Sequence, residues 1–267
     1  MNEGQRSLSL PSGLDIPACG GLARLLDAAA GGGGPRTDIP FIAPLMLLTA
    51  FPGAAALAAA PARKGHVLIQ ESLSIDCRSP IRPGEALAAE GRIESESLQG
   101  AGMVLSLDVR AAAGGEIVRL LARLREVPAS GLVALKPLAL ARATRGAQLA
   151  SWETPALTQD AVTDYVRLAG DGNPLHTDAA FARSVGLEGT VVPGALLAGL
   201  LEPVLPLLGE MRSLRGLRMR FAAPHPVGES AGFAVVRNEA STRDDEARVF
   251  IHRADGGVTA IADLAFR

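Results

Sequence analysis

Aromatic residues are scarce in this chain, because seven Phe, one Trp and one Tyr make up only 3% of its 267 residues. Proteins that bind single-stranded nucleic acid stack bases on aromatic side chains, so this activity is not expected. A basic excess is also missing, since 28 Asp and Glu residues outnumber 26 Lys and Arg residues. Binding to phosphate backbones depends on such an excess, and we therefore expect no nucleic-acid partner.

Cysteine is rare as well, with only Cys19 and Cys77 in the chain. Two isolated thiols supply neither a disulfide framework nor a thiolate metal site, so both are interpreted as reduced structural residues. The amino terminus carries charges at Glu3, Arg6 and Asp15 and has no early apolar run. That pattern does not fit a secretory signal, and the sequence predicts a cytoplasmic protein.

One uncharged run, residues 39–62, is long enough to cross a bilayer, and either a membrane span or a buried helix could produce it. Pro44 and Pro52 lie inside the run, and much of the rest is alanine. Proline costs about 3 kcal/mol in a helix interior, and a lone span has no neighbouring helices to satisfy the freed backbone groups. The pattern therefore favours a buried helix, and no membrane partner is expected.

Short internal similarities indicate a duplicated unit. Residues 42–48 resemble residues 191–197, and residues 79–85 resemble residues 223–229. Because the two matches occur in the same order at nearly the same offset, we predict two halves of ordinary domain size. The predicted boundaries are residues 1–130 for the first half, 131–146 for a linker and 147–267 for the second half.

In each half an apolar helix precedes stretches that alternate apolar and polar residues, as half-buried strands do. An apolar helix must be covered on most sides, which a curved sheet can do. We therefore predict an α+β fold with two curved antiparallel sheets, each wrapped around an apolar central helix. The expected strands span residues 67–75, 86–94, 103–111, 117–125, 214–221, 231–238, 247–252 and 260–266.

The segment of residues 165–178 carries the strongest functional signal. Helical spacing of apolar residues leads into it, with Thr158 as the expected N-cap and Gly170 as the residue that ends the helix. Pro174 keeps the residue before it out of the helical region, so we expect residues 171–176 to be bent and non-helical. Asp178 is expected to cap the next short helix.

Asp171 and His176 lie on this loop, where a carboxylate and an imidazole can converge on one small polar ligand. The alternative is ordinary turn chemistry, because Asp and Asn side chains bond their own backbone while Gly and Pro set the dihedral angles. A metal site is not expected, since no further ligands occur at a familiar spacing. The full pattern D-x-N-P-x-H is more specific than a turn requires.

With this pattern, the segment resembles the R-specific enoyl-CoA hydratase (MaoC-like) family of hot-dog folds. The family signature is an aromatic residue, Gly-Asp-x-Asn-Pro-x-His-x-Asp, an Ala, a Gly-containing turn and an apolar helix that opens with Gly. The close match covers residues 165–201, and the repeat extends a double hot-dog arrangement over nearly the whole chain. The matching residues are Tyr165, Gly170, Asp171, Asn173, Pro174, His176, Asp178, Ala182, Gly186 and Gly194.

The resemblance implies reversible hydration of trans-2-enoyl thioesters to R-3-hydroxyacyl thioesters. It assigns acid and base catalysis to Asp171 and His176, orientation of Asp171 or the substrate to Asn173, and stabilisation of the developing enolate to the backbone N–H at Gly194. The expected substrate is an acyl-CoA or acyl-carrier-protein thioester, without a cofactor or metal, and the expected assembly is a homodimer. The alternatives are a hot-dog acyl thioesterase, because this fold also hosts that activity, and a non-catalytic acyl-thioester-binding module.

The remaining candidates are weaker. His66, His225 and His252 lack a comparable context and are expected to be structural or exposed. A basic cluster from residue 212 to residue 220 could meet a coenzyme A or carrier-protein phosphate, but alternation along a strand favours an exposed face. Its members are Arg212, Arg215, Arg218 and Arg220. One active site per chain is predicted, because the counterpart of the motif falls at residues 22–27, which lack an Asn-Pro turn and a histidine.

Overall fold

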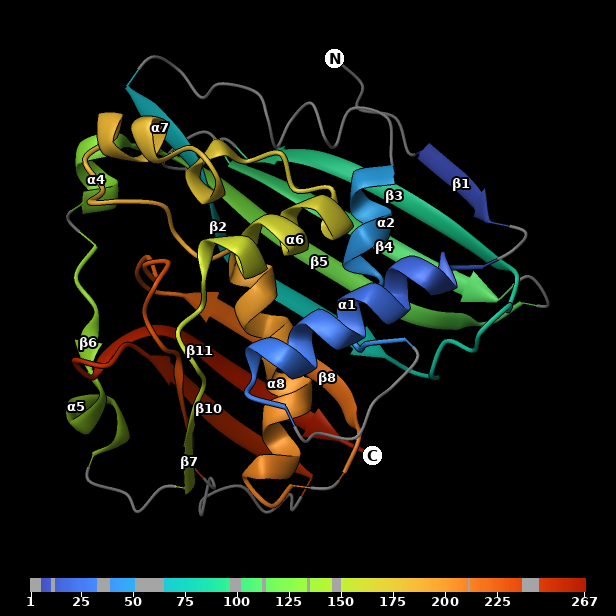
Figure 1. The fold of residues 1–267 in the computed structure, drawn as a ribbon. Coiled ribbons are helices and arrows are strands. Elements are labelled where there is room, and N and C mark those ends of the chain that lie inside the picture. The colour runs from blue at the N-terminus through green and yellow to red at the C-terminus, as the bar shows by residue number, and fades with distance from the viewer. Residues whose placement is uncertain are drawn as a thin grey trace.

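The computed structural model shows one large antiparallel sheet, with the longer helices packed against one face of it (Figure 1). It describes residues 6–10, 13–32, 39–50, 65–96, 102–111, 114–133, 135–145, 150–210, 212–236 and 245–267. This architecture confirms the predicted α+β class. The two predicted sheets are joined edge to edge, because a strand of each half pairs with the other.

The strands follow the order β1-β3-β4-β5-β2-β8-β11-β10-β9-β7, with β6 paired to β11. All eight predicted strands occur, with ends that differ from the prediction by three residues or fewer. The three short strands β1, β6 and β7 were not predicted, because so few residues establish no alternation. The bounds are β1 (Arg6–Leu10), β2 (His66–Cys77), β3 (Leu87–Glu96), β4 (Gly102–Ala111), β5 (Glu116–Pro128), β6 (Leu138–Ala139), β7 (Ala150–Glu153), β8 (Leu214–Phe221), β9 (Gly232–Val236), β10 (Glu246–His252) and β11 (Gly257–Phe266).

The register between β2 and β8 reveals the internal symmetry. Gly84 and Gly228, which occupy equivalent turns of the repeat and both have positive φ, are 144 positions apart. Ser74 and Arg218 are also 144 positions apart, and they lie directly opposite each other in the sheet. Equivalent residues that pair across antiparallel strands define a local twofold axis through that pair. The repeat seen in the sequence is therefore a structural repeat about the centre of the sheet.

The helices are α1 (Ile16–Ala29), α2 (Leu45–Ala50), α4 (Ala129–Val133), α5 (Leu140–Thr144), α6 (Gln159–Ala169), α7 (Ala179–Ser184) and α8 (Gly194–Leu207), with a 3₁₀ turn η1 (Pro174–His176). α2 and α8 follow Pro44 and Pro193, as predicted from the matched apolar runs. The prediction of a helix is wrong for residues 39–44, which form a turn before α2, and residues 51–62 lie outside the described residues. In the described parts of the chain, no helix has the length and apolarity of a membrane span.

α8 is the apolar centre of the second half, with nine of its residues buried. Gly199 lets neighbouring segments approach closely, because a Cβ atom there would lie 2.6 Å from Cδ1 of Ile42 and 2.8 Å from Cδ2 of Leu26. Both contacts come from the first half of the sequence. One hydrophobic core therefore extends across the two halves.

The segment predicted as a linker, residues 131–146, contains short elements, since α4 ends in it and β6 and α5 lie within it. Leu138 and Ala139 extend the sheet beside β11. The division of the chain at residues 130 and 147 remains a prediction. Cys19 and Cys77 are buried and free, and burial raises the pKa of both thiols, that of Cys19 to about 11.

Candidate active site

The candidate loop is held between two helices by local capping, as predicted. The Thr158 hydroxyl accepts a hydrogen bond from the N–H of Ala161 at 3.2 Å and so caps α6. Gly170 ends α6 with φ 67°, a left-handed conformation that glycine adopts without a steric penalty. The Asp178 carboxylate accepts from the N–H of Phe181 at 2.9 Å and caps α7.

Between these caps the chain folds into two consecutive Asx turns. Asp171 Oδ1 accepts the N–H of Asn173 at 3.0 Å, and Asn173 Oδ1 accepts the N–H of Leu175 at 3.1 Å. Asn173 is extended, as predicted from the following proline. The prediction that the whole loop is non-helical is wrong for Pro174–His176, which form a 3₁₀ turn because the fixed φ of proline suits its first position and Asn173 caps it.

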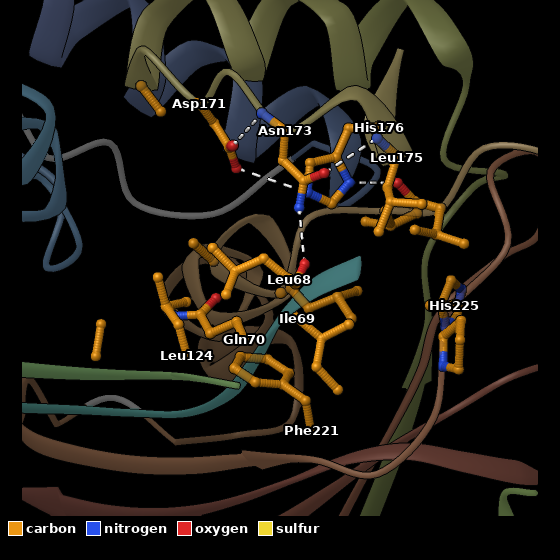
Figure 2. A pocket seen from close by; sticks show the side chains of 18 of the residues that line it. Leu68, Ile69, Gln70, Leu124, Asp171, Asn173, Leu175, His176, Phe221 and His225 are labelled. Atoms are coloured by element: carbon orange, nitrogen blue, oxygen red, sulfur yellow. Dashed lines mark hydrogen bonds and ion pairs between the residues drawn. The ribbon is translucent and has the colours of Figure 1, made fainter. Parts of the chain in front are cut away.

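These turns bring Asp171 and His176 together. His176 Nε2 lies 3.6 Å from Asp171 Oδ2, and His176 Nδ1 lies 2.8 Å from the carbonyl oxygen of Val191 (Figure 2). A carbonyl oxygen only accepts, so the Nδ1 atom carries a proton and Nε2 is the ring nitrogen that faces Asp171. The imidazole is mostly buried, with 11% of its side chain exposed.

Three polar side chains fix this loop: Asn173 within it, and Gln159 and Thr190, which the sequence did not single out. The Gln159 amide donates to the carbonyl oxygen of His176 at 2.9 Å, and the Thr190 hydroxyl donates to the Gln159 carbonyl at 2.6 Å. Asn173 donates to the carbonyl oxygen of Leu68 on β2 at 3.3 Å. Both ends of the Asn173 amide are therefore used within the protein, so Asn173 anchors the loop to the first half.

A cavity of about 220 Å³ opens beside Asp171 and His176. The loop, Asn173 and the start of α8 form its polar end. The first half and the linker form an apolar wall, and Tyr165 closes the cavity as a buried side chain whose pKa is raised by burial. The residues of this wall are Leu45, Leu48, Leu68, Ile69, Leu105, Ala122, Leu124, Leu132 and Leu135, with Gln70 among them.

Gly194 lies at the first turn of α8, against the ring of Phe221 on β8. A Cβ atom at Gly194 would lie 2.6 Å from Cε1 of Phe221, a distance that forces the ring to move. The first intrahelical bond of α8 is the one from the Leu197 N–H to the Pro193 carbonyl at 3.2 Å. The preceding N–H groups at the helix start have no intrahelical acceptor, and they lie at the positive end of the helix dipole.

His225 also lines the cavity, a placement that its sequence context gave no reason to expect. Its Nδ1 lies 3.2 Å from the Thr259 hydroxyl, and burial lowers its pKa to about 4, so the ring is neutral near pH 7. His252 instead packs over Gly232 and lies beside the carbonyl oxygen of Arg253. His66 starts β2 and does not line the cavity.

The predicted basic cluster divides in the structure. Arg215, Arg218 and Arg220 are all exposed on β8, as the exposed-face interpretation predicts. Arg212 departs from that pattern, because it is paired with Glu210 at 2.6 Å and lies over the Phe266 ring at 4.7 Å. In the described part of the chain, no group of three or more His, Cys, Asp and Glu side chains is placed to hold a metal ion.

A second cavity, of about 270 Å³, occupies the place related to the first by the internal repeat. Each of its residues Cys77, Pro80 and Ile81 lies 144 positions before a residue that lines the first cavity, namely Phe221, Pro224 and His225. Its described lining contains no histidine. Residues 22–27, the counterpart of the motif, lie inside α1 and do not reach it.

Comparison with solved structures identifies the fold. HtdX of Mycobacterium tuberculosis is similar with a TM-score of 0.68 and 18% identity, covering 98% of this chain and 100% of that one. A MaoC-like dehydratase from Phytophthora capsici is similar with a TM-score of 0.71 and 15% identity over 100% of this chain and 96% of that one. An acyl-ACP thioesterase from Bacteroides thetaiotaomicron has a TM-score of 0.55 and 12% identity over 100% of both chains. The chain therefore has the predicted hot-dog fold.

Residues 142–253 match the family model described as MaoC like domain. The second half of the chain thus contains a MaoC-like dehydratase domain, which includes Asp171, His176 and α8. No curated protein matches the sequence.

Proposed function

We propose that the protein catalyses the reversible hydration of trans-2-enoyl thioesters to R-3-hydroxyacyl thioesters, with Asp171 and His176 as catalytic residues. The observation that carries this proposal is the pairing of His176 Nε2 with Asp171 Oδ2 at 3.6 Å, at the polar end of an otherwise apolar cavity. The MaoC-like domain match supports a dehydratase or hydratase. The R configuration rests on the resemblance of the motif to the R-specific family.

In the proposed reaction, a water molecule is held between the imidazole and the carboxylate. Nε2 of His176 accepts a proton from this water while its oxygen forms a bond to C3 of the substrate. The electron pair of the double bond moves toward the thioester carbonyl and forms an enolate. The proton then passes from the pair to C2 as the enolate collapses, so that water has been added across the double bond from one face.

The enolate oxygen would be stabilised by the backbone N–H at Gly194, where the helix start offers a free donor and a positive dipole end. The acyl chain would lie along the apolar wall that the first half provides, among Leu45, Leu105 and Leu124. Burial of this chain would supply binding free energy without contributing directly to the chemistry.

The ultraviolet absorbance of the conjugated enoyl thioester tests this proposal across a series of trans-2-enoyl-CoA chain lengths. Hydration lowers the absorbance without releasing thiol, whereas a thioesterase, the activity of one structural neighbour, releases free thiol. A protein that only binds acyl thioesters changes neither signal. Thiol release without hydration, or no change at any chain length, would contradict the proposal.

The thioester carrier, the location of the protein and its assembly are also proposals. The thioester carrier is coenzyme A or an acyl-carrier protein, and activity with each carrier distinguishes them. We also propose a cytoplasmic homodimer, and light scattering of the purified chain measures that assembly directly.

A further inference from the structure

Gln70 is the exception in the apolar wall of the cavity. Among the described residues up to 135 that line this cavity, it alone has a polar side chain. The backbone of Gln70 pairs with Leu124 on β5, and its amide makes no side-chain hydrogen bond within the described parts of the chain. An amide in such a wall needs a partner, because an unpaired polar group surrounded by apolar side chains costs free energy.

A β-bulge directs Gln70 into the cavity. Gln70 lies opposite Leu124 and Ser72 lies opposite Arg123, which leaves Glu71 as the extra residue of β2. The extra residue shifts the alternation, so that Gln70 shares the inner face with Leu73. Glu71 instead pairs with Arg125 at 2.9 Å. The bulge therefore places a neutral amide in the cavity and directs the neighbouring carboxylate to an arginine.

The internal repeat shows that an apolar residue fits the equivalent position. Leu214 lies 144 positions after Gln70 and lines the second cavity. A register shift on β11 leaves Arg215, the counterpart of Glu71, as the extra residue of β8. The two strands thus share the bulge and the inward direction, but only the cavity beside the catalytic pair receives an amide.

Gln70 lies on the wall that faces the Asp171 loop (Figure 2). Leu68, two residues earlier on the same strand, is anchored to Asn173 of that loop. Two residues of a strand span about 7 Å, so Gln70 lies one pleat along β2 from this anchor. An acyl chain that enters the apolar part of the cavity passes this amide.

We infer that Gln70 is a specificity determinant that selects acyl chains bearing an oxygen function, a hydroxyl or a carbonyl, over plain alkyl chains. A primary amide both donates and accepts, so it can pair with either group. A plain alkyl chain would bury the amide without a partner, and sites built to hydrogen-bond a substrate group discriminate strongly against analogues that lack it. This inference rests on the proposed hydration of enoyl thioesters.

The kinetic test uses a plain trans-2-enoyl-CoA and a set of its analogues with a hydroxyl at successive positions of the chain. For the intact protein we expect kcat/KM to be about tenfold or more higher for the best hydroxylated analogue. Gln70→Leu, which matches the residue at the repeat-related position, should lose or reverse that preference. Glu71→Gln, which changes the neighbouring outward residue, should keep it.

If Gln70→Leu lowers kcat/KM equally for plain and hydroxylated substrates, the inference is overturned, because the amide would then act at the thioester. An unchanged preference would overturn it as well.

A binding measurement separates this inference from the proposed function. In an Asp171→Asn background, calorimetry compares a saturated acyl-CoA with its hydroxylated analogue. Tighter binding of the hydroxylated ligand by about tenfold, abolished by Gln70→Leu, would support the selection even if no enoyl thioester is hydrated. Equal affinities for the two ligands would contradict the selection whether or not hydration is observed.

Discussion

The Nδ1 atom of His176 lies 2.8 Å from the carbonyl oxygen of Val191, fifteen residues further along the chain. This contact fixes the tautomer, because the carbonyl can only accept the Nδ1 proton. It leaves Nε2 as the ring nitrogen that faces Asp171 and the cavity. In the proposed reaction, Nε2 is therefore the ring nitrogen that receives the proton of the water molecule.

The Asp171 and His176 pair is the first target for mutation. Asp171→Asn and His176→Ala should each lower hydration turnover by about 10²-fold or more, the usual size of a lost acid or base. Circular dichroism and thermal unfolding should show an intact fold in both variants. Asp164→Asn is a matched control, because Asp164 is an exposed carboxylate of α6 that pairs with Arg167. Unchanged turnover in either site variant would exclude the proposed mechanism.

The contact between Gly194 and Phe221 predicts a second effect. Gly194→Ala places a methyl group 2.6 Å from the Phe221 ring, so the start of α8 or the ring must shift. We expect kcat/KM to fall by about tenfold or more, because small displacements of an oxyanion donor are costly. The double variant Gly194→Ala/Phe221→Leu should recover part of that loss, and steady-state kinetics of all three proteins measure the recovery. If the double variant shows only the sum of the losses of the two single variants, the contact between Gly194 and Phe221 does not cause the fall in kcat/KM.

The two unlike cavities predict one active site per chain. Titration with a tight-binding substrate analogue should give one equivalent, because the second cavity has no histidine among its described lining residues. The isolated second half, residues 147–267, should be insoluble or inactive, since the first half supplies most of the apolar wall. Two equivalents per chain, or a fully active second half, would show that this division of labour is wrong.

The neutral His225 predicts a loss of stability in acid. Its pKa is lowered from 6.5 to about 4 by burial, so the unfolded state takes up the proton first as the pH falls. Its contribution to stability is complete above pH 6.5 and disappears as the pH falls toward 4. The full effect amounts to about 3 kcal/mol, at about 1.4 kcal/mol per pKa unit.

Urea unfolding of the intact protein and of His225→Asn, from about pH 7.5 to about pH 4.5, measures this contribution. The variant should be less stable near neutral pH but should lose less stability on acidification. If the free energy of unfolding has the same pH dependence in the two proteins, His225 is not the source of the stability lost in acid.

Local sequence signals predicted much of the fold and the core of the candidate site. Alternation located eight strands, because the period of side chains along a strand is independent of its partners. Thr158, Gly170, Asn173 and Asp178 behave as expected, since capping and Asx turns depend on residues two to four positions away. The same turns bring Asp171 and His176 together. The residue spacing of the motif therefore accounts for most of the geometry of this pair.

Other features depend on partners that are distant in the sequence. The bulge that turns Gln70 inward is defined by its register with β5, and the tautomer of His176 is set by Val191. His225 faces the cavity because β8 and the following turn return beside α8. The sequence thus determined the elements, their caps and the residues of the candidate pair through short-range physics. Only the tertiary structure decided the apolar wall of the cavity, the single amide in that wall and the second cavity in the first half, because each of these depends on the packing of segments far apart in the sequence.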